Sequence, residues 1–208
     1  MMIAIVDYGI GNLGSAAKAF RHVGAESVLS GDPDVLRKAD TLVLPGDGAF
    51  GAAMDELRQR GLLPVLQEAV EQGRTLLGIC VGMQLLFDHS EEHGSHRGLG
   101  LLPGRVRRFK AELPVPHMGW NRLRRRQPHP LLEGLEDGAY VYFVHSYYCE
   151  AKDDVVVASS DYGVDFAAIV GKGNVLGVQF HPEKSQGVGL RMIDNFVRLC
   201  RREAPAWS

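Results

Sequence analysis

The chain has 208 residues, of which 45% are hydrophobic and 23% are charged, and its formal net charge is −2 at pH 7. These values are ordinary for a soluble globular protein, and so small a net charge argues against general affinity for nucleic acids or anionic membranes. The length fits one domain spanning 1–208. The three cysteines are far apart in the sequence and odd in number, so they predict no disulfide framework and fit a reducing cytoplasm.

The first apolar run, 1–6, predicts a buried parallel strand. It has no basic segment before it and ends at Asp7, which indicates a strand and not a signal peptide, and no apolar stretch is long enough to span a bilayer. Gly9, Gly11 and Gly14 follow, with a helix expected from about Ser15. Because their spacing is not Gly-x-Gly-x-x-Gly, we interpret these glycines as a tight turn and not as a nucleotide-binding loop.

Strand and helix patterns alternate along the first half of the chain. Strands are expected at 27–30, 41–44 and 75–79, and helices at 33–39, 49–60 and 62–72. This alternation predicts an α/β fold with three layers (α/β/α), in which helices cover both faces of a central, mostly parallel sheet.

Past Gly104 the pattern becomes rich in strands, which predicts an antiparallel β extension of the fold. The arginine-rich segments 105–110 and 120–124 are interpreted as the solvated side of one antiparallel hairpin. Further strands are expected at 139–144, 154–159, 166–170 and 175–179, and a closing helix at 187–201.

The stretch 75–87 joins an apolar run to a helical pattern through a turn that holds a cysteine. Cys80 lies between Gly78 and Gly82, and flanking glycines allow a tight strand-to-helix turn, the thiol counterpart of a nucleophile elbow. The positive end of a helix dipole favours the thiolate form of a cysteine placed there. The backbone N–H of Val81 points at the same place and can hold a developing oxyanion. A small buried cysteine at a strand end is the alternative that this pattern leaves open.

A histidine and a glutamate near the end of the chain supply the partners that a nucleophilic thiol needs. Pro182 biases His181 toward extended dihedrals, and residues i and i+2 of an extended segment point to the same side. Glu183 can therefore fix the tautomer and the orientation of the imidazole ring. We predict that Cys80 is a nucleophile, that His181 is its base and that Glu183 orients the base.

Two stretches, Gly-Ile-Cys-Val-Gly-Met-Gln at 78–84 and Gln-Phe-His-Pro-Glu-Lys-Ser at 179–185, resemble the motifs of the class I glutamine amidotransferases. Within that family, further stretches resemble the glutaminase subunits of imidazole glycerol phosphate synthases: 7–13, 45–50, 116–121 and 142–148. The similarity runs from the first strand to the last helix, and only the residues after about Arg202 lack a counterpart. It implies a triad of Cys80, His181 and Glu183 that hydrolyses glutamine to glutamate and ammonia without a cofactor or a metal.

The resemblance also implies a partner, a synthase (cyclase) subunit that takes up the ammonia within a heterodimer. That subunit would make imidazole glycerol phosphate and AICAR in histidine biosynthesis. Gly48 is assigned to the oxyanion hole beside Val81, and glutamine binding is assigned to Gln84, Glu92, Ser146 and Tyr147. The partner interface is assigned to Pro116, His117, Met118, Gly119, Trp120 and Asn121.

Two alternatives to this function stay open. One is an amidotransferase subunit that serves another acceptor, such as chorismate, and would keep the triad but not the stretches 116–121 and 142–148. The other is a catalytically silent regulatory module on the same fold, against which the intact triad argues.

Asp47 departs from the apolar or neutral residue that is usual at its position in this family. The glycines on either side free the loop to aim an N–H at a substrate oxygen, although an ordinary surface turn explains the pattern equally well. We expect the Asp47 carboxylate to point into solvent, where its field is screened. The peptide between Asp47 and Gly48 would then rotate to present its N–H only when the partner is loaded.

Three histidines and two glutamates lie between His89 and His96 and suggest a metal site. Gly94 and the polar character of the run favour a solvated loop instead.

Overall fold

Within the described residues, 1–110 and 113–201, the computed structural model contains a central eight-stranded sheet in the order β2-β1-β3-β4-β14-β13-β12-β9. The strands from β2 to β14 run parallel to their neighbours, and β13, β12 and β9 join antiparallel. The predicted α/β fold is confirmed, with a mixed sheet at its centre. The strands are β1 (Ile3–Val6), β2 (Ser27–Ser30), β3 (Thr41–Gly46), β4 (Thr75–Cys80), β9 (Arg124–Arg125), β12 (Val156–Asp161), β13 (Asp165–Lys172) and β14 (Val175–Val178).

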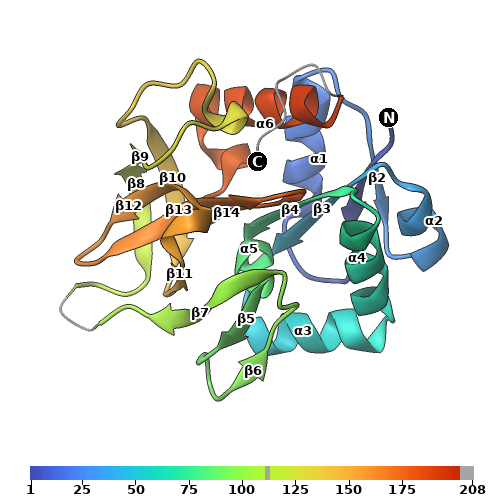
Figure 1. Ribbon diagram of the computed structural model, residues 1–208, viewed down its shortest axis with the longest axis horizontal. Coiled ribbons are helices and arrows are strands. Elements are labelled where there is room, and N and C mark those ends of the chain that lie inside the picture. Colours follow the sequence, from blue (N-terminus) through green and yellow to red (C-terminus); the bar gives the residue numbers. More distant parts are fainter. Residues whose placement is uncertain (111–112, 202–208) are drawn as a thin grey trace.

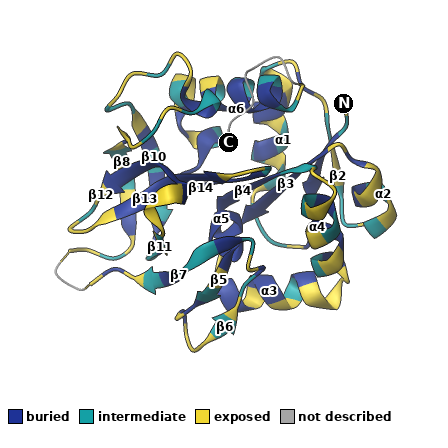
Figure 2. Cartoon of the chain, viewed as in Figure 1, coloured by how far each residue is buried: buried dark blue, intermediate teal, exposed yellow. Residues whose placement is uncertain are grey.

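Helices cover both faces of this sheet (Figure 1). α1 (Leu13–His22) and α6 (Gln186–Cys200) lie on one face, with an edge-to-face contact between Phe20 and Phe196. The other face carries α3 (Phe50–Gln59), α4 (Leu62–Glu71) and α5 (Val81–Leu85). The strands between these two layers are buried along most of their length, whereas the outer faces of the helices are exposed (Figure 2). Removing apolar strand residues from water on both sides is the main force that holds the three layers together.

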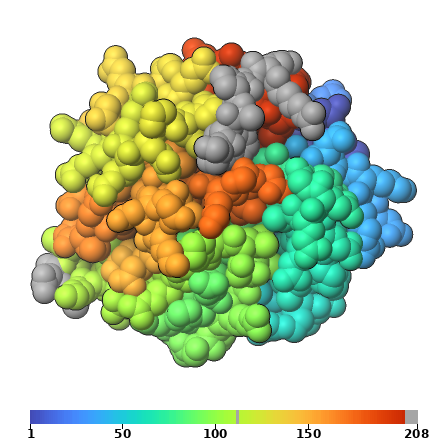
Figure 3. All heavy atoms as spheres, viewed as in Figure 1, coloured from blue at the N-terminus to red at the C-terminus, as the bar shows by residue number. Residues whose placement is uncertain are grey.

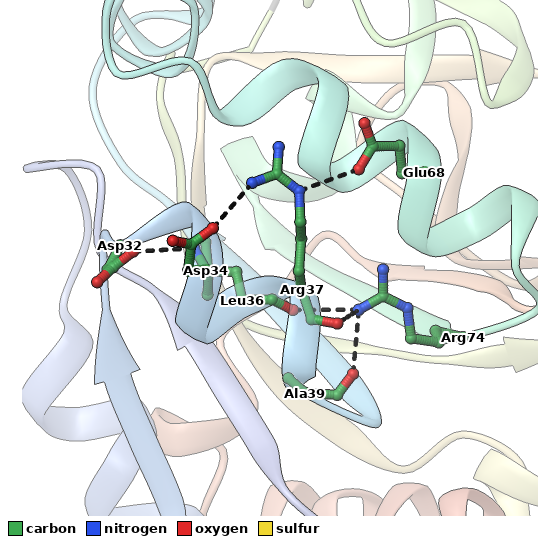
Figure 4. A network of polar contacts seen from close by, with 7 residues as sticks. All are labelled: Asp32, Asp34, Leu36, Arg37, Ala39, Glu68 and Arg74. Carbon is green, nitrogen blue, oxygen red and sulfur yellow. Dashed lines mark hydrogen bonds and ion pairs between the residues drawn. The ribbon is translucent and has the colours of Figure 1, made fainter.

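α2 (Pro33–Lys38) is fastened beside α4 by two arginines (Figure 4). Arg37 donates from Nε to a carboxylate oxygen of Glu68, at 3.2 Å. Arg74 donates to three carbonyl oxygens at the end of α2, those of Leu36, Arg37 and Ala39. A basic group at this end satisfies carbonyls that the helix leaves without an internal partner. These contacts hold the end of α2 in place beside α4.

Two smaller sheets form the β-rich extension. One pairs β8 (His117–Arg122) with β10 (Tyr140–His145) in antiparallel register. The other has the order β11-β7-β5-β6, made of β11 (Tyr147–Ala151), β7 (Leu102–Arg108), β5 (Phe87–Ser90) and β6 (His96–Arg97). In the space-filling view, the orange residues of β12 to β14 separate the green part of the chain around β5 and β7 from the yellow part that follows β8 (Figure 3).

The structure corrects two predictions in this region. The predicted hairpin between 105–110 and 120–124 is wrong, because β7 pairs with β11 and β5 while β8 pairs with β10. Alternating arginines do mark the solvated side of β7, where Arg107 meets Glu150 of β11 at 3.2 Å, but alternation cannot identify the neighbouring strand. The solvated loop predicted for 89–96 is also wrong in part, since its ends belong to β5 and β6.

Short 3-10 turns lie between some of these elements: η1 (Pro130–Leu132), η2 (Asp153–Val155) and η3 (Pro182–Lys184). The strand expected at 154–159 therefore begins later, at Val156. The residues after Arg202, which lack a counterpart in the family, lie outside the described part of the chain. No helix of the described residues is both long enough and apolar enough to cross a membrane.

Candidate active site

Cys80 sits in a strained turn between β4 and α5. Its dihedrals are φ 56° and ψ −115°, in a region that residues other than glycine rarely adopt. A side chain at Gly82 would overlap the carbonyl oxygen of Leu44, and one at Gly46 would overlap the backbone N of Gly82. The glycines therefore let the elbow pack directly on β3, and this contact holds the cysteine in its unfavourable conformation. The predicted nucleophile elbow has the geometry that such a site requires.

Parallel pairing of β14 with β4 brings the histidine to the cysteine. Val178 lies opposite Ile79 in this register, so the residues that follow β14 emerge beside Cys80. The His181 Nδ1 atom lies 2.8 Å from Glu183 Oε1, and both side chains are buried. A carboxylate accepts only, so Nδ1 carries the proton and donates it, which leaves Nε2 to face the sulfur.

Glu183 reaches this position in a different way from the one predicted. His181 has extended dihedrals, but residues 182–184 form η3, so the fully extended segment is wrong. Ser185, which the motif analysis gave no role, fixes the turn. Its hydroxyl donates to the His181 carbonyl at 2.7 Å and accepts from the Tyr142 N–H at 3.0 Å. The triad partners are therefore tied to β10 as well as to the central sheet.

The contacts of His181 with Cys80 and Glu183 favour the protonated form of its imidazole. Burial by itself lowers the pKa of His181, but hydrogen bonds to Cys80 and Glu183 outweigh it and raise that pKa to about 10. At neutral pH the imidazole is therefore protonated where it faces the Cys80 sulfur. That arrangement supplies a nucleophile and, next to it, an acid for the leaving group.

The loop after β3 lies on the oxyanion side of the site. The Tyr8 hydroxyl donates to the Pro45 carbonyl at 2.7 Å and so anchors the end of β3, from which this loop departs. Gly48 has a φ of 70°, and its N–H is donated to Oδ1 of Asp47 at 2.8 Å. The Asp47 side chain is exposed, as expected, but it engages the same N–H that was assigned to the oxyanion hole.

The residues assigned to glutamine binding come from separate segments, and three of them converge near the elbow. Buried Glu92 accepts the Phe50 N–H at 2.6 Å, where α3 begins without a side-chain cap. Buried Gln84 donates to the Tyr147 carbonyl at 3.0 Å. Burial and the negative charge of Glu92 raise the pKa of Tyr147, which places the two side chains near one another. Ser146 makes a backbone contact, in which its carbonyl accepts from the Phe109 N–H at 3.1 Å.

The stretch assigned to the partner interface divides between the surface and the interior. Met118 is 62% exposed and Trp120 is 46% exposed, and both lie on the outer side of β8. The His117 side chain is 3% exposed, so its place in an exposed patch is wrong. Strand alternation is the reason, since i and i+2 share a face and the residue before Met118 must point inward. Pro116 is exposed, whereas Gly119 and Asn121 are half-buried.

The histidines and glutamates of 89–96 do not form a metal site in the described part of the chain, where no group of three or more potential ligands converges. His96 packs its ring over Gly51 at the start of α3. Glu92 is used by the Phe50 N–H, as described above.

Comparison with known families and proteins agrees with this geometry. The family model "Glutamine amidotransferase class-I" matches residues 4–200. The protein from Geobacillus kaustophilus named "Imidazole glycerol phosphate synthase subunit HisH" is 57% identical over 205 residues, covering 95% of this chain and 97% of its own. Proteins of the same name from Syntrophotalea carbinolica and Bacillus cereus (strain G9842) are 51% and 50% identical; the alignments cover 94% of this chain and 98% and 93% of theirs.

Solved structures share the fold at lower sequence identity. A crystal structure of a glutamine amidotransferase superposes with a TM-score of 0.76 at 23% identity, covering 96% of this chain and 98% of its own. The glutaminase domain of Trypanosoma brucei CTPS with bound acivicin gives a TM-score of 0.70 at 14% identity, covering 100% and 96%. At these identities the likeness concerns the fold alone.

Proposed function

The chain belongs to the class-I glutamine amidotransferase family, and we propose that it is the glutaminase subunit of an imidazole glycerol phosphate synthase in histidine biosynthesis. The observation that carries this proposal is the buried Cys80, His181 and Glu183 constellation at a strained elbow. Relatives that bear the name of this synthase subunit match the chain at 50% to 57% identity over nearly its whole length. A cytoplasmic location follows from the same assignment.

In the first half of the reaction, the Cys80 thiolate attacks the carboxamide carbon of glutamine. The developing oxyanion is held by the Val81 N–H at the start of α5 and by the Gly48 N–H once the Asp47 carboxylate releases it. The C–N bond then breaks, and His181 protonates the departing nitrogen so that ammonia leaves. The product on the enzyme is a γ-glutamyl thioester.

In the second half, water hydrolyses the thioester. Neutral His181 now takes a proton from the water, whose oxygen attacks the thioester carbon, and the thiolate departs to regenerate the charged pair. Glu183 keeps the ring in one tautomer throughout, because its Oε1 holds the Nδ1 proton. The site needs no metal or cofactor for either step.

The base is joined through β10 to an exposed apolar patch, which supports a partner that receives the ammonia. Met118, Trp120 and Tyr140 are exposed on β8 and β10, and the Trp120 ring contacts Tyr142 edge-to-face. The backbone carbonyl of Tyr142 accepts the His181 N–H at 3.0 Å. Contiguous exposed aromatic and methionine side chains are typical of protein interfaces. We infer that a synthase (cyclase) subunit covers this patch in a heterodimer.

Transfer inside a complex also follows from the chemistry of the product. Ammonia released into water at neutral pH becomes ammonium, which has no lone pair with which to attack an acceptor. A glutaminase that feeds a synthase must therefore deliver neutral ammonia before solvent protonates it. The hydrogen bond from the His181 N–H to the Tyr142 carbonyl joins the base to β10, the strand that carries part of the patch, which supports delivery on this side.

The test compares glutamate release by the purified chain alone and with candidate synthase subunits. We expect release to be low for the chain alone and to rise strongly with the imidazole glycerol phosphate synthase partner, with transfer of the amide nitrogen into its product. Stimulation by a chorismate-dependent partner would favour a sibling amidotransferase. Absence of glutamate release with every partner would identify a silent module.

A further inference from the structure

A buried amide lies beside the nucleophile, and no step of the mechanism above uses it. Gln179 is the residue after β14, and its backbone N–H extends the ladder to the Ala168 carbonyl at 2.9 Å. Its side chain is fully buried, with Nε2 directed to Cys80 Sγ at 3.9 Å. His181, two residues on, shares this side of the segment and also meets the sulfur. Gln179 and His181 therefore approach Cys80 as two neighbouring donors.

A second buried amide fixes the orientation of the first. Gln84 donates from Nε2 to Gln179 Oε1 at 3.1 Å and to the Tyr147 carbonyl at 3.0 Å. With its oxygen accepting from Gln84, Gln179 presents its nitrogen to the sulfur, and a flipped amide would lose both contacts. The direction of this donation is thus set by the network and not by Cys80 alone.

The same Tyr147 carbonyl also accepts from His145, which is in turn hydrogen-bonded to a second neutral histidine, His117. His145 Nδ1 lies 2.7 Å from this carbonyl and must donate to it, so His145 Nε2 accepts from His117 Nδ1 at 3.0 Å. His117 Nε2 in turn accepts from Asn121 Nδ2 at 3.2 Å. Burial lowers the pKa of His117 to about 4 and that of His145 to about 3, so both rings are neutral at pH 7. One assignment of tautomers satisfies every hydrogen bond in the series from Asn121 through His117 and His145 to the Tyr147 carbonyl.

The glutamine side and the histidine side of this network share one acceptor. His145 and Gln84 both donate to the Tyr147 carbonyl oxygen, which has no proton to pass on. The network therefore cannot carry protons between the surface and the sulfur. Its function is to hold groups in fixed positions.

We propose that Gln179 is a positioning residue for Cys80. The side-chain N–H of Gln179 holds the sulfur in line for attack and stabilises the thiolate. Gln84 and the Tyr147 carbonyl keep the Gln179 amide in the donating orientation, and the histidine pair keeps Tyr147 in place. The separation of 3.9 Å shortens when substrate and partner bind, as catalytic contacts commonly do. This inference rests on the proposed function, in which Cys80 is the nucleophile.

The test measures the alkylation rate of Cys80 by iodoacetamide across pH in the full chain, with and without the synthase partner. Peptide mass spectrometry separates Cys80 from the other two cysteines. Gln179→Met removes the N–H but keeps a side chain of similar length. We expect the pH midpoint of alkylation to rise by about 1 unit, so that the rate at pH values below the midpoint falls about tenfold. We also expect kcat to fall with KM little changed, because the contact strengthens on the way to the transition state.

Two further variants sharpen the measurement. Gln179→Glu keeps the size of the side chain and the contact with Gln84 but cannot donate when it is ionised. It should therefore raise the pH midpoint of alkylation at least as far as Gln179→Met does. If Gln179→Met does not fold, Gln179→Glu alone tests the inference. Asn195→Leu is the matched control. Asn195 is also a buried amide; it lies on α6 and donates to the carbonyls of Leu131 in η1 and of Glu133 just after it. Its loss should therefore lower stability and leave the alkylation midpoint unchanged.

The possible outcomes distinguish a failure of this inference from a failure of the proposed function. If an alkylating glutamine analogue labels Cys80 of the parent chain and both Gln179 variants keep the parental midpoint, Gln179 has no positioning role, although the proposed function stands. If the analogue does not label Cys80 of the parent chain, the proposed function fails and this inference fails with it. A midpoint that moves in the Gln179 variants but not in Asn195→Leu supports the inference.

Discussion

The contact between Asp47 and the Gly48 N–H should act as a brake on basal glutaminase activity. Asp47 Oδ1 accepts this N–H at 2.8 Å, in competition with the oxyanion that the same N–H is proposed to hold. The carboxylate is exposed, so water competes for it and the contact is worth only about 1 kcal/mol, below the usual range for a hydrogen bond to a charged group. Freeing the N–H by Asp47→Ala should therefore raise the basal turnover about fivefold, since a tenfold change requires about 1.4 kcal/mol.

The variant Asp47→Asn separates the effect of the hydrogen bond to the Gly48 N–H from the effect of the negative charge. In Asp47→Asn the side-chain oxygen still accepts the Gly48 N–H, and the exposed charge that is removed acts through a screened field. Its basal turnover should therefore stay near that of the parent chain. Asp32→Ala provides the matched control, because Asp32 is another exposed aspartate that accepts a backbone N–H at 2.8 Å, at the start of α2 (Figure 4).

The assay is steady-state glutamate release by the chain without synthase, with kcat and KM measured separately. Asp47→Ala should raise kcat with little change in KM, because an oxyanion donor acts on the transition state. A large rise in Asp47→Asn would show that the charge itself is the brake. An unchanged kcat in Asp47→Ala would refute the idea that the contact withholds the Gly48 donor.

Further predictions concern the base, the partner and the buried histidines. In the assembled complex, His181→Ala should lower kcat by orders of magnitude and Glu183→Gln by less, because the second residue only orients the first; a silent Glu183→Gln would reduce the triad to a dyad. Trp120→Ala should weaken partner binding by roughly 2 kcal/mol and uncouple nitrogen transfer, and a parental dissociation constant by calorimetry would count against the patch. The free energy of unfolding should fall as pH drops from 6.5 toward 3, because the unfolded chain protonates His117 and His145 near pH 6.5 while their folded pKa values lie at about 4 and 3. Urea titrations at pH 7 and pH 5 test this, and a variant lacking both imidazoles should lose less stability than the parent chain.

The parts of the site that depend on backbone conformation could be predicted from sequence. Gly78 and Gly82 around Cys80 indicated a turn too tight for side chains, and the structure places both against neighbouring backbone. The contact between His181 and Glu183 was predicted from their spacing around Pro182, although η3 and not an extended segment brings the two side chains together. Local signals sufficed here because the interacting residues belong to one short segment or share one turn.

Features that depend on which strands become neighbours could not be predicted. The alternation of β7 revealed its solvated side but not its pairing with β11 and β5. The link from Gln179 to Gln84 spans 95 positions, and no spacing rule connects two such glutamines. His117 was assigned to the partner interface together with Met118 and Trp120, and the sequence did not show that its side chain points inward. The direction of each side chain followed only once the register with β10 was known.

The most direct test of the central claim is to identify which cysteine reacts as the nucleophile. The chain is incubated with an alkylating glutamine analogue, alone and with the synthase partner, and each cysteine-containing peptide is analysed by mass spectrometry. Cys80 should carry the label, faster with the partner present, whereas Cys149 should stay unlabelled because burial raises its pKa and keeps it protonated. Equal labelling of Cys80, Cys149 and Cys200, or glutamate release that survives Cys80→Ser, would contradict the proposed glutaminase.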